Sequence, residues 1–153
     1  MATLLTTLLI VVAATYVGYT MLVGEGTERD DNAPVSMTTW VDEAGDVCFA
    51  VAEEYPLLTQ GSESRLDSDN LETVSAGVQT LNTRIQDLPP LTEDMAQDEV
   101  DAIVALGPPA RDAWLSLEDD DDVSEDDLSD ASTLTSAYVG GLVELGADCG
   151  VLD

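Results

Sequence analysis

Residues 2–24 form an unbroken run without a charged side chain, although the whole chain carries 32 Asp and Glu residues. The hydrocarbon core of a bilayer is about 30 Å thick, and a helix that spans it needs about 20 predominantly apolar residues. The run has this length. We therefore expect residues 1–24 to form a single transmembrane anchor, residues 25–36 a polar linker, and residues 37–153 an acidic domain in water.

A retained anchor fits this run better than a cleaved secretory signal. Such signals have a basic n-region and an apolar core of 7–15 residues, whereas no Lys or Arg precedes this longer run. Ala14 and Gly18 make a small-xxx-small pair, the spacing at which another membrane helix can approach closely. We name Ala14 and Gly18 as candidate packing residues of an anchor that is otherwise surrounded by the lipid bilayer.

The orientation of the anchor is weakly encoded, because Arg29 is the basic residue nearest to the run and acidic residues flank it. The positive-inside rule counts Lys and Arg in the flanking loops and has little to count here. The chain also has two cysteines, and disulfides persist in oxidising compartments. We therefore expect a single-pass protein with its acidic domain on the extracytoplasmic side of a cell-envelope or virion membrane.

The charge balance is extreme: four Arg and no Lys or His oppose the acidic residues, and the net charge is −28. Such a domain repels itself in dilute buffer, whereas at about 1 M salt the Debye length falls to about 3 Å. The composition resembles that of proteins from salt-in halophiles, above all haloarchaea. A disordered tail or a polyanion mimic is the alternative, but 44% of the residues are hydrophobic, which disfavours disorder. The scarcity of cations excludes nucleic-acid binding through a basic face.

Apolar residues recur at helical spacing in four segments of the acidic domain. The first segment begins after the candidate N-caps Ser36 or Thr38 and ends near Pro56. The second begins after Ser68 or Asp69 and stops before a pair of prolines. Its apolar residues have heptad spacing and are Leu71, Val74, Val78, Leu81, Ile85 and Leu88.

The third segment starts at the candidate cap Thr92 and is interrupted by the Gly-Pro-Pro sequence of residues 107–109. The pattern leaves open whether this segment is one kinked helix or two helices. The fourth starts at Ser124, with Asp127 as its capping-box partner, and its apolar spacing continues to Cys149. Four amphipathic segments joined by short loops predict an all-α fold: a single N-terminal transmembrane helix followed by a small antiparallel four-helix bundle.

Cys48 and Cys149 each lie on the apolar side of a predicted helix, the first and the fourth of the bundle. These helices are neighbours in an antiparallel bundle, so we expect a disulfide, with two buried free thiols as the alternative. A bond that closes a loop of about 100 residues stabilises by about 4.7 kcal/mol in the chain-entropy model. One obstacle is that Cys48 is at mid-helix and Cys149 at a helix end, so the helices would need an axial offset.

The residues that most catalytic sites and transition-metal sites need are missing. Without His there is neither a Ser-His-Asp nor a Cys-His site, and two Cys cannot supply four zinc ligands. Acidic residues between 118 and 127 offer oxygen ligands for Ca²⁺ or Mg²⁺, but without the spacing of an EF-hand, so we interpret them as a hydrated loop. We assign no catalytic residue, no cofactor and no metal ligand, and we do not expect an enzyme.

These observations favour a non-enzymatic structural or interaction protein. It would hold an acidic bundle at a membrane and contact other proteins of a halophilic envelope assembly or of a membrane-containing virion. The alternative is a ligand-binding accessory subunit of a membrane transporter or sensor. That role predicts a pocket inside the bundle, lined by the aromatic residues Trp40, Tyr55, Trp114 or Tyr138.

Overall fold

The computed structural model describes residues 33–60, 70–118, 120 and 122–152. The predicted anchor at residues 1–24, with its packing pair Ala14 and Gly18, and most of the predicted linker lie outside these residues. Within the described ranges, no helix combines the length and the apolar character needed to cross a bilayer.

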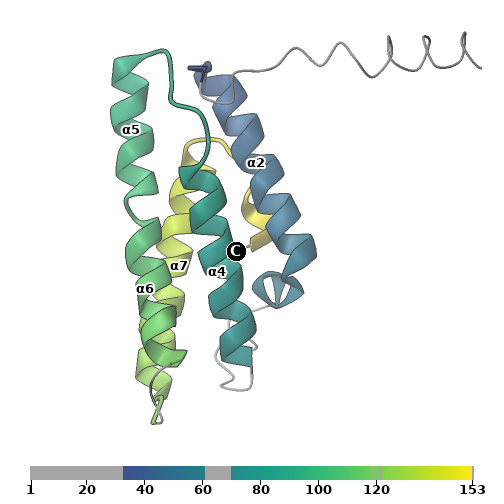
Figure 1. The fold of residues 1–153 in the computed structure, drawn as a ribbon, viewed down its shortest axis with the longest axis vertical. Coiled ribbons are helices and arrows are strands. Elements are labelled where there is room, and N and C mark those ends of the chain that lie inside the picture. Colours follow the sequence, from purple (N-terminus) through teal and green to yellow (C-terminus); the bar gives the residue numbers. More distant parts are fainter. Residues whose placement is uncertain (1–32, 61–69, 119, 121, 153) are drawn as a thin grey trace, which may run out of the picture. The chain divides into compact units, whose positions relative to one another are not determined.

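The described part of the domain is all-α. Its helices are α2 (Met37–Glu54), α4 (Leu71–Gln86), α5 (Asp94–Val104), α6 (Gly107–Glu118) and α7 (Glu125–Glu144), with the 3-10 turns η1 (Pro56–Thr59) and η3 (Gly150–Leu152). Helices α2, α4, α6 and α7 pack as a bundle in which each runs opposite to the next (Figure 1). The prediction of a small four-helix bundle is confirmed.

The third predicted segment is two helices, α5 and α6, which follow one another along the same side of the bundle (Figure 1). Pro108 and Pro109 lie in the first turn of α6. Proline lacks the N–H that a helix interior requires but is tolerated in a first turn, where the N–H groups have no partner within the helix. The two prolines therefore begin a new helix instead of kinking an existing one.

Two predicted helix starts are confirmed. The Ser36 hydroxyl accepts a hydrogen bond from the Thr39 N–H at 3.3 Å, and Ser124 and Asp127 form a capping box. The predicted cap at Thr92 is wrong, because α5 begins one residue later, after Glu93. The Thr92 N–H donates to the Val35 carbonyl at 2.9 Å.

The predicted start of the second bundle helix, α4, is one or two residues too early, because its N-cap is Asn70 instead of Ser68 or Asp69. For α5 the N-cap is Glu93. Both corrections shift a helix start by only one or two residues.

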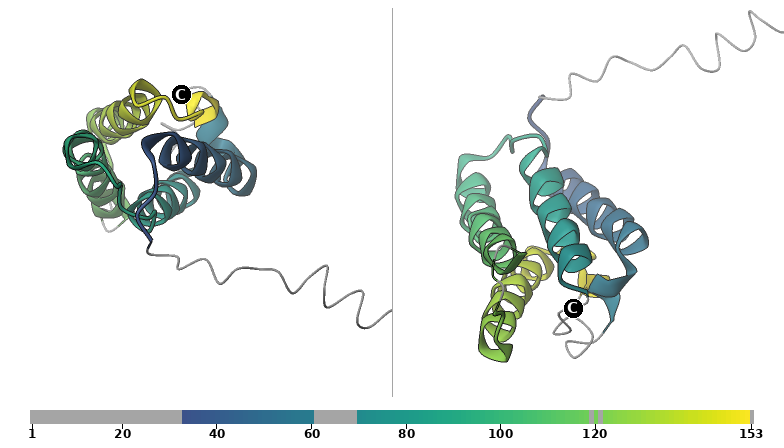
Figure 2. Two further views of the ribbon diagram at one scale, coloured as in Figure 1. Left: turned by 90° about the horizontal axis from the view of Figure 1, so that it is seen from above. Right: turned by 60° about the horizontal axis from the view of Figure 1, so that its bottom comes forward.

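The end of the fourth helix also differs from the prediction. Helix α7 stops at Glu144, and Gly146 adopts a φ of +102°. The Gly146 N–H donates to the Val143 carbonyl and the Ala147 N–H to the Leu142 carbonyl, which is the Schellman arrangement that terminates helices at a glycine. The chain then turns back. Its last described residues, 147–152, which we call the C-terminal segment, lie between α7 and α2 (Figure 2).

The core is formed by the faces that the apolar spacing predicted. Val74, Val78, Leu81 and Ile85 of α4 are fully buried, which confirms the heptad pattern for the middle of that helix. Trp114 of α6 is also buried and donates its indole N–H to the Thr135 hydroxyl of α7 at 2.8 Å. This bond satisfies the donor of a fully buried tryptophan.

Candidate interaction groove beside the disulfide

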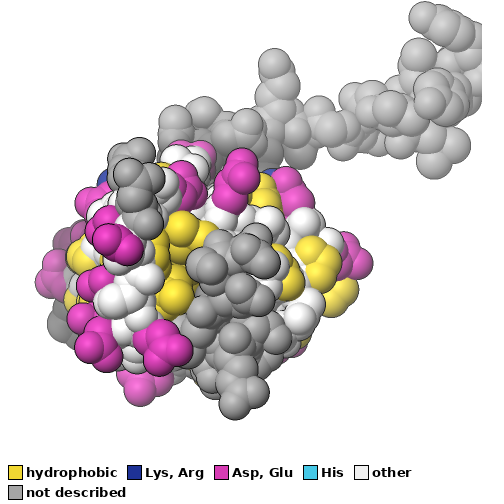
Figure 3. Space-filling model, turned by 90° about the horizontal axis from the view of Figure 1, so that it is seen from below, with side chains coloured by type: hydrophobic (Ala, Val, Ile, Leu, Met, Phe, Trp, Pro, Cys, Tyr) yellow, Lys and Arg dark blue, Asp and Glu magenta, His cyan; other side chains and the backbone are white. Residues whose placement is uncertain are grey.

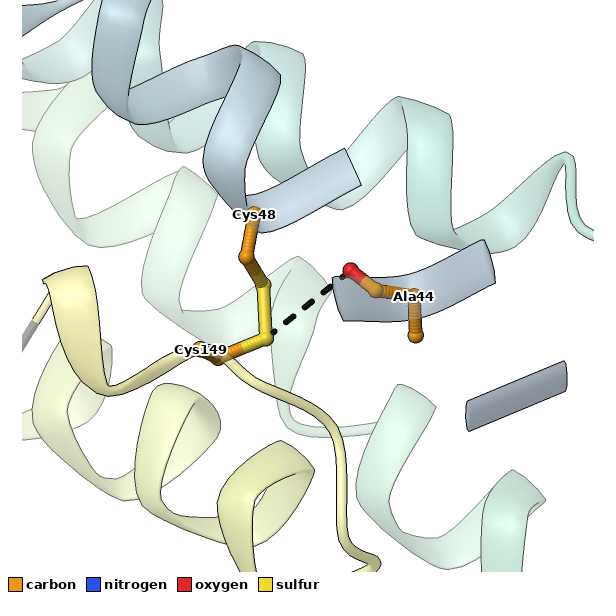
Figure 4. Close-up of a disulfide and its surroundings, with 3 residues drawn as sticks. All are labelled: Ala44, Cys48 and Cys149. Carbon is orange, nitrogen blue, oxygen red and sulfur yellow. Dashed lines mark hydrogen bonds between the residues drawn. A yellow bond between two sulfur atoms is a disulfide. The ribbon is translucent and has the colours of Figure 1, made fainter. Parts of the chain in front are cut away.

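Cys48 of α2 and Cys149 of the C-terminal segment form a disulfide (Figure 4), which confirms the predicted pairing. Their Cα atoms are 5.2 Å apart and both side chains are fully buried. The bond needs no axial offset between α2 and α7, because the turn at Gly146 carries Cys149 back to the middle of α2. The Cys149 sulfur also contacts the Ala44 carbonyl oxygen at 3.9 Å.

The C-terminal segment passes close to α2 at Gly45, whereas the contact between Gly146 and Val41 is an ordinary one. A Cβ atom on Gly45 would lie 3.2 Å from the Asp148 backbone nitrogen, and one on Gly146 would lie 3.6 Å from Val41 Cγ1. Gly45 therefore leaves room for the backbone of the returning chain. The disulfide one helical turn away holds this approach covalently.

A hollow of about 390 Å³ opens beside this contact. We call it the α2 groove, and its lining residues are Val41, Asp42, Gly45, Asp46, Phe49, Gly146 and Asp148.

One wall of the α2 groove is a single helix face, because residues 42, 46 and 49 are four and three positions apart. Asp148 comes from the returning segment opposite. Phe49 is 57% exposed, so much of its aromatic side chain is open to solvent, and it lines the groove together with the carboxylates.

The described lining of the α2 groove is negative. Two ion pairs between described residues, Arg84–Glu54 and Arg111–Asp112, each have an N–O distance of 2.6 Å, and neither includes a lining residue of the groove. Its three carboxylates add to one local negative potential. In the described part of the chain, no group of three or more acidic, Cys or His side chains is arranged to hold a metal ion.

Acidic side chains are not confined to this groove. On the end of the domain shown in Figure 3, Asp and Glu side chains spread over the described surface, with hydrophobic patches between them. Acidity by itself therefore does not distinguish the groove. What distinguishes it is a concave shape combined with an exposed aromatic ring.

The four aromatic residues that would line the alternative ligand pocket lie in different environments. Trp114 and Tyr138 are fully buried in the core. The Tyr55 hydroxyl accepts a hydrogen bond from the Thr80 hydroxyl at 3.1 Å. Trp40 lines a hollow of about 150 Å³ near the end of α4. The structure thus places Trp114 and Tyr138 as packing residues.

One buried cluster within the core is polar. Asn82 Oδ1 accepts a hydrogen bond from Gln86 Nε2 at 3.1 Å, while Asn82 Nδ2 and the Tyr138 hydroxyl have no hydrogen-bond partner among the described residues. Burial raises the pKa of Tyr138 well above its ordinary value, because the phenolate would lose its hydration. Gly107 approaches both side chains: a Cβ atom there would lie 3.0 Å from Tyr138 Cζ and would overlap Asn82 Oδ1.

The α2 groove was not predicted from the sequence. Phe49 carried a usable signal, because it falls outside the helical face shared by Trp40, Ala44 and Cys48 and yet is apolar. Asp148 carried none, because its position depends on the turn at Gly146. No family model, curated protein or solved structure matches this chain.

Proposed function

We propose that this protein is a membrane-anchored, non-enzymatic interaction protein of a halophilic envelope assembly or of a membrane-containing virion. The observation that carries the proposal is the uncharged run of residues 2–24, followed by a chain that holds every charged side chain and the whole net charge of −28. A charged residue at the centre of a spanning helix costs about 2.5–3.5 kcal/mol on insertion scales. A long run without charge in so acidic a chain therefore supports an anchor.

The domain suits an extracytoplasmic interaction role. The Cys48–Cys149 bond closes the fold covalently, and such bonds persist where the environment is oxidising. The α2 groove leaves a hollow and an exposed aromatic ring open to a partner. Both features support an outward-facing domain that contacts other proteins of the assembly.

The anchor is tested by extracting membranes that contain the full-length protein with alkaline buffer in molar salt. The native chain is expected to stay in the membrane pellet. A Leu9→Asp/Val12→Asp variant is expected in the supernatant, because it places two carboxylates in the middle of the run. A Leu9→Ile/Val12→Leu variant is the matched control and should stay in the pellet. Extraction of the native chain would refute the anchor.

The interaction role is tested by purifying the native protein in mild detergent and molar salt and identifying what co-purifies by mass spectrometry. A reproducible set of envelope or coat proteins is expected. Gly18→Leu should reduce its recovery, because a bulky side chain would separate the helices that meet at the Ala14/Gly18 pair. Recovery of the native protein alone would contradict the interaction role and leave the anchor as a simple tether.

A further inference from the structure

We propose that the α2 groove binds a segment of a partner protein through an Arg or Lys side chain of that segment. This inference names the kind of partner and rests on the interaction role proposed above. Its starting point is the shape of the groove, whose volume of about 390 Å³ falls within the range of about 300–1,000 Å³ that is usual for ligand sites.

The groove has the chemistry that a cationic side chain requires. The exposed face of Phe49 attracts a cation that lies within about 6 Å of the ring centroid. Asp42 and Asp46 lie on the same helix face as Phe49, and Asp148 lies on the opposite wall. Carboxylates hold a guanidinium through charge-assisted hydrogen bonds, and none of these three takes part in an ion pair of the described residues.

The cation is expected from a different protein. The chain has four Arg and no Lys, and the two Arg that the structure describes already pair with Glu54 and Asp112. A second copy would bring another charge of −28 to an acidic groove. Charge complementarity therefore favours a partner that is richer in Arg or Lys.

Salt concentration explains why a groove is needed when the whole surface is acidic. At about 1 M salt, attraction beyond about 3 Å is screened, so only pairs in direct contact retain their strength. A concave site limits the access of water and counterions to such a pair more than a flat acidic surface does. The groove is also held in place by the disulfide and the Gly45 contact, which lowers the entropy lost on binding.

The test measures binding of a fluorescent peptide with two arginines to the full-length protein in detergent, by anisotropy at about 0.1 M and about 1 M KCl. A peptide with citrulline in place of arginine is the uncharged control. The groove variants are Asp42→Asn/Asp46→Asn and Phe49→Ala. The matched variant is Asp126→Asn/Asp130→Asn, which removes the same charge at the same spacing from exposed positions of α7.

We expect the arginine peptide to bind at both salt concentrations and the citrulline peptide to bind at least about tenfold more weakly. At about 1 M KCl each groove variant should weaken binding by about tenfold or more, a loss of about 1.4 kcal/mol or more, and the α7 variant by less than about twofold. An equal loss in both double variants would overturn the proposal in favour of general acidity. Equal binding of the arginine and citrulline peptides would also overturn the proposal, because the groove would then bind through apolar contacts and not through a cation.

Three further outcomes separate this inference from its alternatives. Binding that appears only after Arg29→Gln/Arg65→Gln would mean that an arginine of this chain occupies the groove, which overturns the assignment to a partner. Co-purification of partners that persists unchanged in the groove variants, together with no binding of the arginine peptide, would refute this inference and leave the proposed function intact. If the full-length protein were not retained in membranes, or co-purified with no partner, while the arginine peptide still bound the groove, the proposed function would be refuted and this inference would stand.

Discussion

Tyr138 shows how strongly the core constrains a single side chain. Its hydroxyl is fully buried without a hydrogen-bond partner among the described residues, an arrangement that costs about 1–3 kcal/mol. Burial also raises the pKa of the phenol. In the unfolded chain the phenol ionises near pH 10, whereas in the folded chain it keeps its proton to higher pH.

Stability is therefore expected to fall as the pH rises above about 10, because only the unfolded state then loses this proton. The expected slope is about 1.4 kcal/mol per pH unit for one proton. Tyr138→Phe should remove this part of the alkaline loss and raise the unfolding free energy at neutral pH by about 1 kcal/mol. Denaturant unfolding at several pH values checks both.

Tyr55→Phe is the control for this measurement. It removes a phenol that has a hydroxyl partner, Thr80, and leaves Tyr138 in place, so the alkaline loss should persist. A Tyr138→Phe variant that is clearly less stable at neutral pH would show that the buried hydroxyl has a partner in solution.

Glycines lie where α6 meets α4 and α7, and where α7 meets α5. A Cβ atom on Gly107 would overlap Asn82 Oδ1, and one on Gly141 would lie 2.9 Å from two carbon atoms of Ile103. Gly140, the neighbour of Gly141 in α7, has no heavy atom within 4 Å of its Cβ position. The Gly140-Gly141 pair thus contains one contact residue and one residue that faces open space.

Substitution by alanine is therefore expected to have opposite effects at Gly107, which is in tight contact, and at Gly140, which faces open space. Gly107→Ala should lower the unfolding free energy by about 1–3 kcal/mol, the usual penalty for overpacking, because Asn82 and Tyr138 would have to move. Gly140→Ala should raise it by about 1 kcal/mol, since alanine is the better helix former and meets nothing there. Thermal or denaturant unfolding of both variants decides the question, and a stabilising Gly107→Ala would mean that α6 is not held this close to α4.

Local sequence signals were enough to predict the helices but not the way in which the chain ends. The apolar spacing found the four bundle segments, and side-chain chemistry found the caps at Ser36 and Ser124. The prolines at 108 and 109 marked a break without showing whether it was a kink or a new helix, and the turn at Gly146 depends on backbone hydrogen bonds that apolar spacing does not report. The α2 groove was beyond prediction, because its walls are about 100 residues apart in sequence.

The whole molecule is dominated by charge of one sign. Its net charge is −28, and the ion pairs of the described residues, Arg84–Glu54 and Arg111–Asp112, involve partly exposed side chains that contribute little to stability. Self-repulsion in the folded state is therefore opposed mainly by salt.

We expect the unfolding free energy of the full-length protein in detergent to fall when KCl is lowered from about 1 M to about 0.1 M, where the Debye length grows from about 3 to about 10 Å. Sucrose in place of the missing KCl is the control: it does not screen charge and stabilises only by its exclusion from the protein surface, so it should restore less of the loss than KCl does. The Asp126→Asn/Asp130→Asn variant should lose less than the native chain. Equal stability at both salt concentrations would contradict the halophilic interpretation of the composition.

The Cys48–Cys149 bond also fixes how the domain responds to mechanical load. A pull applied between residues that precede Cys48 and residues that follow Cys149 passes through the sulfurs, so the 101-residue separation between them cannot be stretched out. Fully extended, that stretch of chain would span more than about 300 Å. Of the described residues, only those before Cys48 and those after Cys149 can then unravel, and most of the bundle remains mechanically shielded.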